Sequence, residues 1–229
     1  MISNRLAAGK KISVIVTGAT GMVGEGVLHE CLQHAQVERV LIVNRKPSGV
    51  SHPKLTEIVH ADFQDLKPIR ERLQGYDACL YCIGTSSVGM KEAEYSRVAH
   101  EIPTHMAKLL AELNPGMTFC YISADGADVS ERGRSMWARV QGKTENVLMG
   151  LPFEQVYIFR PSYIHPTKGL KNAHRLYAFI SWSYPLLRRL MPGYVTTLRE
   201  LGTAMIHAVT RGYEKSVLKS RDFAKLAKS

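Results

Sequence analysis

The sequence predicts an α/β fold, a doubly wound parallel sheet with helices on both faces. Apolar runs of strand length alternate with longer segments of helical pattern, which is typical of successive strand–helix–strand units. A glycine-rich turn stands between the first apolar run and the first helical segment. The chain has 229 residues, 45% of them hydrophobic and 22% charged. This length and composition suit one α/β domain with a sizeable core.

The expected elements follow in chain order. We expect strands at residues 11–17, 39–44, 56–60, 77–83, 117–123 and 155–159, and helices at residues 22–34, 68–74, 92–113 and 134–149. Pro103 falls inside the third helical segment and should kink or break it. After Arg160 the strand signal fades. We therefore expect a single domain over residues 1–229, in which residues from about 160 to 229 form a small, mostly helical lobe facing a substrate.

The most informative feature is the turn at residues 17–24, Thr-Gly-Ala-Thr-Gly-Met-Val-Gly. Gly18 permits a tight turn, Gly21 lets a pyrophosphate approach the backbone, and Gly24 lets the helix pack closely on the strand. The helix N-terminus offers free N–H groups and the positive end of its dipole to an anion. The turn therefore predicts a dinucleotide site. We place cofactor contacts here at Gly18, Thr20, Gly21, Met22 and Val23.

The ends of later strands supply further candidate cofactor contacts. The second strand ends at Asn44 and continues with Arg45 and Lys46, where an acidic residue would bind the ribose diol of NAD. Two cations suit a 2′-phosphate instead, so the sequence favours NADP over NAD, with ordinary surface cations as the alternative. The remaining predicted contacts are Asp62 and Phe63 beside the adenine, Ile83, Gly84 and Thr85 after the fourth strand, and Pro161 and Ser162.

These motifs together resemble a known family. They are the glycine turn, the run Cys82-Ile83-Gly84-Thr85, the segment Ser-Ala-Asp-Gly-Ala-Asp at 123–128, and Phe159-Arg160-Pro161. The chain resembles the extended and atypical short-chain dehydrogenase/reductases, and most of all their NmrA-like and Tat-interacting-protein branch. Bacterial members of that branch are often labelled NAD-dependent epimerase/dehydratase. The resemblance implies a Rossmann domain, a nicotinamide cofactor and a Ser, Tyr, Lys catalytic set.

The catalytic part of the resemblance is incomplete. In the family the tyrosine stands four residues before the lysine, since both then share one helix face, where lysine lowers the tyrosine pKa and holds the nicotinamide ribose. The matching positions here are Trp137 and Gln141, and neither side chain titrates usefully. Lys143 does not restore the pair, because it points nearly opposite Gln141 on the helix. Ser123 matches the family serine only loosely.

The candidate catalytic residues are therefore Ser123, Trp137, Gln141 and Tyr163. Tyr163, with His165, would donate a proton if the following loop folds over the nicotinamide; simple packing is the alternative. Direct hydride transfer to an electron-poor acceptor such as a quinone or flavin asks less of a general acid. Two functions stay open: an NADP(H)-dependent oxidoreductase or epimerase-like enzyme acting on a small anionic or apolar substrate, and a non-catalytic NADP(H)-binding module that senses redox state or carries a partner.

The charge of the chain is unevenly distributed. The net charge is +10, and seven Lys or Arg but no acidic residue lie between Arg160 and Arg199. This basic segment suits an anionic ligand, an anionic membrane or a solvated surface, and without a recognisable motif we expect no nucleic-acid partner. Within it, an aromatic run flanked by Arg175 and Arg189 is too short to span a bilayer. We expect a core helix or pocket lid there, with peripheral membrane contact as the alternative.

The cysteines indicate where the chain resides and what it does not bind. With no leader or spanning run recognised, we expect a cytoplasmic protein. Cys79 and Cys82 stand three residues apart on a predicted strand, which places their thiols on opposite faces. We therefore expect buried structural thiols and no metal site.

Overall fold

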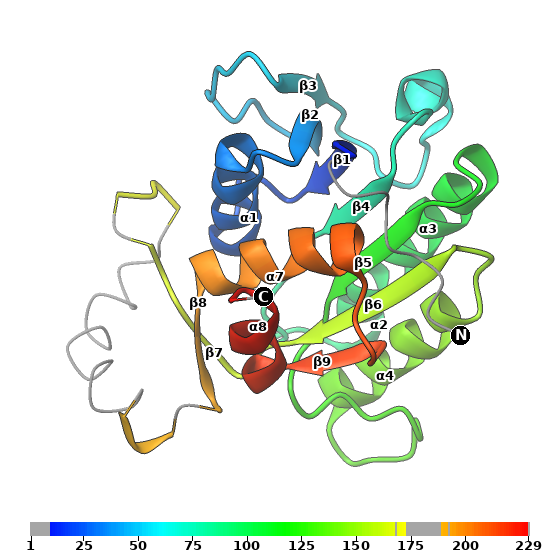
Figure 1. Cartoon of the computed structure of the whole chain (residues 1–229). Coiled ribbons are helices and arrows are strands. Elements are labelled where there is room, and N and C mark those ends of the chain that lie inside the picture. Colours follow the sequence, from blue (N-terminus) through cyan, green and yellow to red (C-terminus); the bar gives the residue numbers. More distant parts are fainter. Residues whose placement is uncertain (1–9, 168, 173–188, 192, 229) are drawn as a thin grey trace.

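The computed structural model describes residues 10–167, 169–172, 189–191 and 193–228. Seven parallel strands form one sheet in the order β3-β2-β1-β4-β5-β6-β9 (Figure 1). The strands are β1 (Ile12–Thr17), β2 (Val37–Asn44), β3 (Leu55–Val59), β4 (Ala78–Tyr81), β5 (Thr118–Ile122), β6 (Gln155–Arg160) and β9 (Val217–Lys219). The strand order reverses between β1 and β4, where sheets of this kind bind ligands beyond the carboxyl ends of their strands. This is the doubly wound Rossmann sheet that the sequence predicts.

Helices cover both faces of the sheet (Figure 1). The helices are α1 (Met22–Gln33), the 3₁₀ helix η1 (Lys67–Leu73), α2 (Glu92–Ser96), α3 (Ile102–Leu113), α4 (Met136–Met149), α7 (Leu198–Arg211) and α8 (Ser220–Leu226). One core joins the sheet to α1, α7 and α8, and the other joins it to η1, α3 and α4. Side chains of a strand alternate between the two cores, so Cys79 lies in one and Cys82 in the other. The predicted placement of these two buried, free thiols on opposite faces is confirmed.

The third predicted helix is interrupted just before Pro103. It consists of α2, a π-helical stretch η2 (Arg97–Glu101) and α3. Pro103 stands in the first turn of α3 and has no N–H to donate, and the Ala99 carbonyl oxygen, four residues earlier, accepts from Thr144 Oγ1 at 2.8 Å. Thr104 Oγ1 donates to the His100 carbonyl oxygen at 2.6 Å. The break predicted from the proline is therefore present, and it takes the form of a π-helical stretch.

The C-terminal part contains three short strands that the sequence did not predict. β9 joins the main sheet beside β6, and β7 (Tyr163–His165) pairs with β8 (Val195–Thr197) in a separate sheet. Strands this short give no clear two-residue periodicity. α7 packs on α1 at close range, since a Cβ added to Gly202 would lie 2.8 Å from Glu30 Cγ. The residues after Arg160 therefore complete the main domain besides forming any substrate-facing part.

The segment flanked by Arg175 and Arg189 lies outside the described residues, apart from the exposed Arg189. The expectation of a lid or membrane-contacting helix there accordingly stays a prediction. Among the helices that the structure describes, none combines the length and the hydropathy needed to cross a membrane.

Candidate dinucleotide site

Two glycines of the turn after β1 are required by the protein's own packing. Gly18 has φ +70°, and a Cβ there would lie 2.7 Å from the Cys82 carbonyl oxygen. A Cβ on Gly24 would lie 2.1 Å from the Gly18 carbonyl oxygen. A side chain at either position would therefore push the turn away from β4 or from the start of α1.

Gly21 meets a different requirement. Its φ of −105° is open to any residue, and a Cβ would meet only the Gly18 carbonyl oxygen, at 3.4 Å. Gly21 is the N-cap of α1, and no side chain of a described residue caps this helix. An uncapped helix N-terminus beside a position without a side chain fits a phosphate group close to the backbone. The residues of the turn thus fit the pyrophosphate of a dinucleotide.

Buried polar side chains hold the turn in place. Asn44, at the end of β2, is 2% exposed, and its Oδ1 accepts from the Ala19 N–H at 3.2 Å. Thr17 Oγ1 accepts from the Cys82 N–H at 3.1 Å. Asn44 Nδ2 donates at 3.1 Å to Glu57 Oε1, which also accepts from a backbone N–H of the next loop. The structure therefore places Asn44 as a tie between the glycine turn and β3.

Arg45 and Lys46 lie in the loop that this tie fixes. Both side chains are exposed, and neither forms an ion pair with a residue that the structure describes. The loop is anchored to β3, because Glu57 Oε1 accepts from the Ser48 N–H at 2.8 Å. Glu57 was not predicted, since its position inside β3 gives no sign that it braces another strand's loop. Two exposed cations at this end of β2 fit a 2′-phosphate.

The other predicted contacts occupy varied surroundings. Phe63 is 4% exposed and its ring packs in the core, so only its backbone is placed to lie beside an adenine, next to the exposed Asp62. Gly84 and Thr85 are exposed, and a Cβ on Gly84 would meet nothing within 4 Å. Thr20 is exposed, Met22, Val23 and Ile83 are half-buried, and Pro161 is buried. The open space at Gly84, beyond β4, leaves room for a ligand that crosses the switch point.

The first turn of α1 also contacts the C-terminal part of the chain. Glu25 accepts from the backbone N–H groups of Lys171 and Asn172, at 2.8 Å each. These contacts bring the segment after β7 beside the glycine turn. Lys171 and Asn172, which are remote from the glycine turn in the sequence, therefore lie near the candidate pyrophosphate position.

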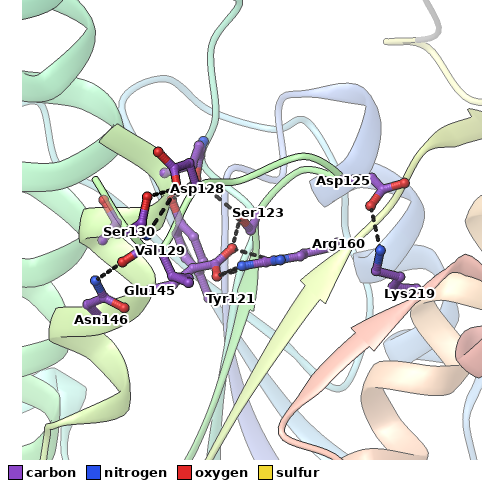
Figure 2. Close-up of polar contacts among 12 residues, drawn as sticks. Tyr121, Ser123, Asp125, Asp128, Val129, Ser130, Glu145, Asn146, Arg160 and Lys219 are labelled. Atoms are coloured by element: carbon purple, nitrogen blue, oxygen red, sulfur yellow. Dashed lines mark hydrogen bonds and ion pairs between the residues drawn. The ribbon is translucent and has the colours of Figure 1, made fainter. Parts of the chain in front are cut away.

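A buried polar network lies where β5 and β6 end (Figure 2). Ser123 follows β5, and its Oγ donates to Glu145 Oε1 at 2.5 Å. Glu145, on α4, is 2% exposed and pairs with Arg160, the last residue of β6, whose Nε lies 2.9 Å from Oε1. A buried ion pair is tolerated when further hydrogen bonds satisfy its atoms, and Ser123 supplies one here.

Arg160 is the first cation of the basic segment, for which the sequence left an anionic ligand, an anionic membrane and a solvated surface open. In the structure it is partly buried, and its charge is balanced by Glu145. Nothing in the sequence connects the two residues, because they lie on different elements and meet only after α4 packs against β6. Glu145 was missed for the same reason.

Gln141 belongs to the same network, one helical turn before Glu145. Its Oε1 accepts from Tyr121 Oη at 2.9 Å, and its Nε2 donates to Tyr95 Oη at 3.0 Å. Ser123 Oγ lies 3.5 Å from Gln141 Oε1. Burial raises the pKa of Tyr95, so its hydroxyl stays protonated at neutral pH. Tyr95 and Tyr121 were not predicted, since an isolated tyrosine in a helix or strand is usually a packing residue.

The remaining candidate catalytic residues lie apart from these hydrogen bonds. Trp137 is half-buried and packs against the cluster of Tyr95, Ala99 and Val140, and a Cβ on Gly126 would lie 3.2 Å from its ring. Tyr163 and His165 are half-buried on β7, outside the main sheet. Among the residues that the structure describes, these hydrogen bonds join Ser123 to Gln141, and Trp137 takes no part in them.

The loop after β5 is tied to the C-terminal part of the chain. Asp125 accepts from Ser162 Oγ at 2.9 Å and pairs with Lys219 at 3.2 Å, as Figure 2 shows in part. Burial acts to raise the pKa of Asp125, but the contacts with Ser162 and Lys219 outweigh it, and the pKa is lowered. Ser162, predicted as a cofactor contact, therefore fixes this loop.

The strand order, the glycine turn at the switch point and the polar network beyond β5 define a dinucleotide-binding protein of the short-chain dehydrogenase/reductase class. The model of the NAD dependent epimerase/dehydratase family matches residues 14–128, half of the chain. The chain belongs to this family.

Individual relatives are distant in sequence. The chain is 25% identical to Protein HTATIP2 of Rattus norvegicus over 154 residues, 66% of this chain and 62% of that protein. It is 29% identical to Leucinostatins biosynthesis cluster protein T of Purpureocillium lilacinum over 116 residues, 49% of this chain and 43% of that protein. The match thus spans under half of one relative's length and under two thirds of the other's.

Solved structures show the same fold. The Bordetella bronchiseptica enzyme WbmG in complex with NAD has a TM-score of 0.67 at 11% identity, over 97% of this chain and 79% of that one. A short chain dehydrogenase family protein from Francisella tularensis has a TM-score of 0.64 at 14% identity, over 91% of this chain and 96% of that one. With the family assignment, the NAD-bound structures of the Bordetella bronchiseptica enzymes WbmG and WbmH support a nicotinamide dinucleotide as the cofactor.

Proposed function

We propose that the protein is an NADP(H)-dependent oxidoreductase that works without the family's Tyr–Lys pair. The observation that carries the choice of NADP is the pair of exposed cations, Arg45 and Lys46, in the loop fixed beside the glycine turn. A 2′-phosphate placed there gains two charge-assisted contacts that a free ribose hydroxyl does not make.

The chain's own residues have separable tasks in this proposal. Gly21 and the N-terminus of α1 hold the pyrophosphate, and Arg45 and Lys46 hold the 2′-phosphate. When bound, the nicotinamide supplies or takes up a hydride. Ser123 directs its proton to Glu145, so it presents a lone pair to the substrate.

The missing general acid narrows the class of substrate. Neither Trp137 nor Gln141 transfers a proton at neutral pH. Acceptors whose reduced form is a stabilised anion, such as quinones or flavins, need no proton from the protein during hydride transfer. We therefore propose an electron-poor acceptor of this kind.

The test is a calorimetric titration with NADPH and NADH. The variant Arg45→Ser/Lys46→Ser should bind NADPH about 10- to 100-fold more weakly and NADH almost unchanged. The control Lys225→Ser/Lys228→Ser removes two exposed charges at the C-terminal end and should leave both affinities unchanged. Equal affinity of the wild-type protein for the two cofactors would contradict the NADP assignment.

A non-catalytic NADP(H)-binding module is the second candidate function. It is favoured by one observation, that the hydrogen bonds of Gln141 are used within the protein while Trp137 packs against the cluster that contains Tyr95 and Val140. NADPH oxidation measured against a panel of quinones, flavins and carbonyl compounds separates the two. Turnover supports the enzyme, whereas tight binding with silence across the panel supports the module.

A further inference from the structure

Tyr95 brings a hydroxyl from α2 into the network beyond β5. The residue is 4% exposed, and the one hydrogen bond of its hydroxyl among the described residues is accepted from Gln141 Nε2, at 3.0 Å. A tyrosine hydroxyl has one donor and two acceptor sites. Whichever way the Gln141 amide is turned, at least one of these sites is unused within the part of the chain that the structure describes.

The position of Tyr95 is held by groups that are themselves fixed. Gln141 is anchored on its other side by Tyr121 Oη at 2.9 Å, and Tyr121 lies within 3.2 Å of the Ala99 carbonyl oxygen. The Tyr95 ring packs with Ala99 and Val140. The Tyr95 hydroxyl is therefore held in a fixed orientation and has an unused hydrogen-bonding site. Such a group suits the binding of a polar ligand group.

The fold indicates which ligand group this is. A dinucleotide crosses the switch point, with its adenosine half over β2 and its other half over the strands beyond β1. The predicted adenosine contacts, Arg45 and Lys46, lie at the end of β2, so the nicotinamide half extends over β4 and β5. Tyr95, Gln141 and Ser123 meet there, and the ribose diol of that half offers both donors and acceptors.

We infer that Tyr95, presented by Gln141, binds the nicotinamide ribose of the cofactor. Tyr95 is then a positioning residue that takes up, from a different helix, the task of holding this ribose. The inference rests on the proposed binding of NADP(H), and it adds a residue to which no role was assigned by the sequence.

The experiment compares two ligands on two variants by calorimetry. NADP⁺ contains the nicotinamide ribose, and adenosine 2′,5′-bisphosphate lacks it. Tyr95→Phe should weaken the binding of NADP⁺ about 5- to 10-fold and leave the affinity for the bisphosphate unchanged. The control Tyr76→Phe removes a tyrosine hydroxyl just before β4, at the other end of the sheet, and should alter neither affinity.

Each other outcome has a definite meaning. If Tyr95→Phe binds NADP⁺ as the wild-type protein does, the inference is wrong while the proposed function stands. If Tyr95→Phe weakens the binding of both ligands equally, the hydroxyl stabilises the fold and does not bind the ribose, and the inference is again wrong. If neither ligand binds the wild-type protein, the proposed function itself fails. Gln141→Leu provides a second check. This variant keeps the Tyr95 hydroxyl but removes the amide that holds it, so it should weaken the binding of NADP⁺ and leave the binding of the bisphosphate unchanged.

Discussion

The glycines of the turn after β1 meet two different requirements, one of packing and one of cofactor binding. Substitutions at Gly24 and Gly21 should therefore affect different properties. Gly24→Ala drives a Cβ to 2.1 Å from the Gly18 carbonyl oxygen, so we expect it to lower the free energy of unfolding by about 2–4 kcal/mol. Gly21→Ala meets nothing closer than 3.4 Å and should change stability by less than about 0.5 kcal/mol. Gly21→Ala should nevertheless weaken the binding of NADPH, because the methyl group occupies the space left for the pyrophosphate. Urea unfolding and calorimetry measure the two effects, and unchanged NADPH affinity in Gly21→Ala would contradict the proposed cradle.

The buried pair of Glu145 and Arg160 should behave differently when one or both charges are removed. Arg160→Met leaves a carboxylate 2% exposed and without its counter-ion, so we expect a loss of about 3–5 kcal/mol in urea unfolding. Adding Glu145→Leu removes the orphaned charge and should recover most of that loss. A double variant as unstable as Arg160→Met alone would show that the carboxylate is not the cause.

Tyr81 carries a hydroxyl that gains nothing from being buried. The residue is fully buried, and its Oη has no hydrogen-bond partner among the described residues. Tyr81→Phe should therefore leave the free energy of unfolding unchanged or raise it by about 1 kcal/mol. A loss of more than about 1 kcal/mol in urea unfolding would reveal a partner for this hydroxyl.

Individual site residues were predictable from the sequence only where a local motif marks them. The glycines of residues 17–24 and the cations after β2 stand in a strand–turn–helix context that the sequence displays. Glu145, Glu57 and Tyr95 act through partners on other elements, which no spacing reveals. The loss of the Tyr–Lys pair was visible in the sequence, whereas the hydrogen bonds around Gln141 were not.

At the level of elements, we expect the contact between α1 and α7 to make the stability of the fold depend on pH. His34 and His207 have ring centroids 5.5 Å apart, and burial lowers the pKa of both, with Arg211 near each and Lys54 near His34. Because the unfolded chain takes up protons more readily than the folded one, stability should fall as the pH drops below about 6.5. Urea unfolding at pH 7.5 and 5.5 measures this loss. His207→Gln should reduce the pH dependence, and an identical dependence in that variant would contradict the assignment.

The strands β1, β2, β4, β5 and β6 were predictable because each contains a run of buried apolar residues, and α1 follows β1 with a clear helical pattern. β3 was predicted although only Ile58 in it is buried. Two kinds of element were not. The three-residue strands β7, β8 and β9 depend on neighbours for their hydrogen bonds, and their residues show no distinct periodicity. The π-helical stretch η2 falls directly before the helix that contains Pro103, and a proline signals a break without its form.

For the whole molecule, the central claim is that this member of the NAD dependent epimerase/dehydratase family binds NADP(H) in preference to NAD(H). The net charge of +10 favours the more anionic cofactor in general, and we propose that the two adjacent cations after β2 distinguish NADP(H) from NAD(H). A fold shared with distant relatives gives the class of cofactor and leaves this preference to a few residues.

The most direct test is thermal unfolding of the wild-type protein with saturating NADPH, NADP⁺, NADH and NAD⁺ in parallel. A ligand at a hundred times its Kd stabilises the native state by about 2.7 kcal/mol, which raises Tm by roughly 5–10 °C in a chain of this size. We predict this rise with NADPH and NADP⁺ alone. An equal rise with all four cofactors would contradict the role given to Arg45 and Lys46, and no rise with any would contradict the dinucleotide site itself.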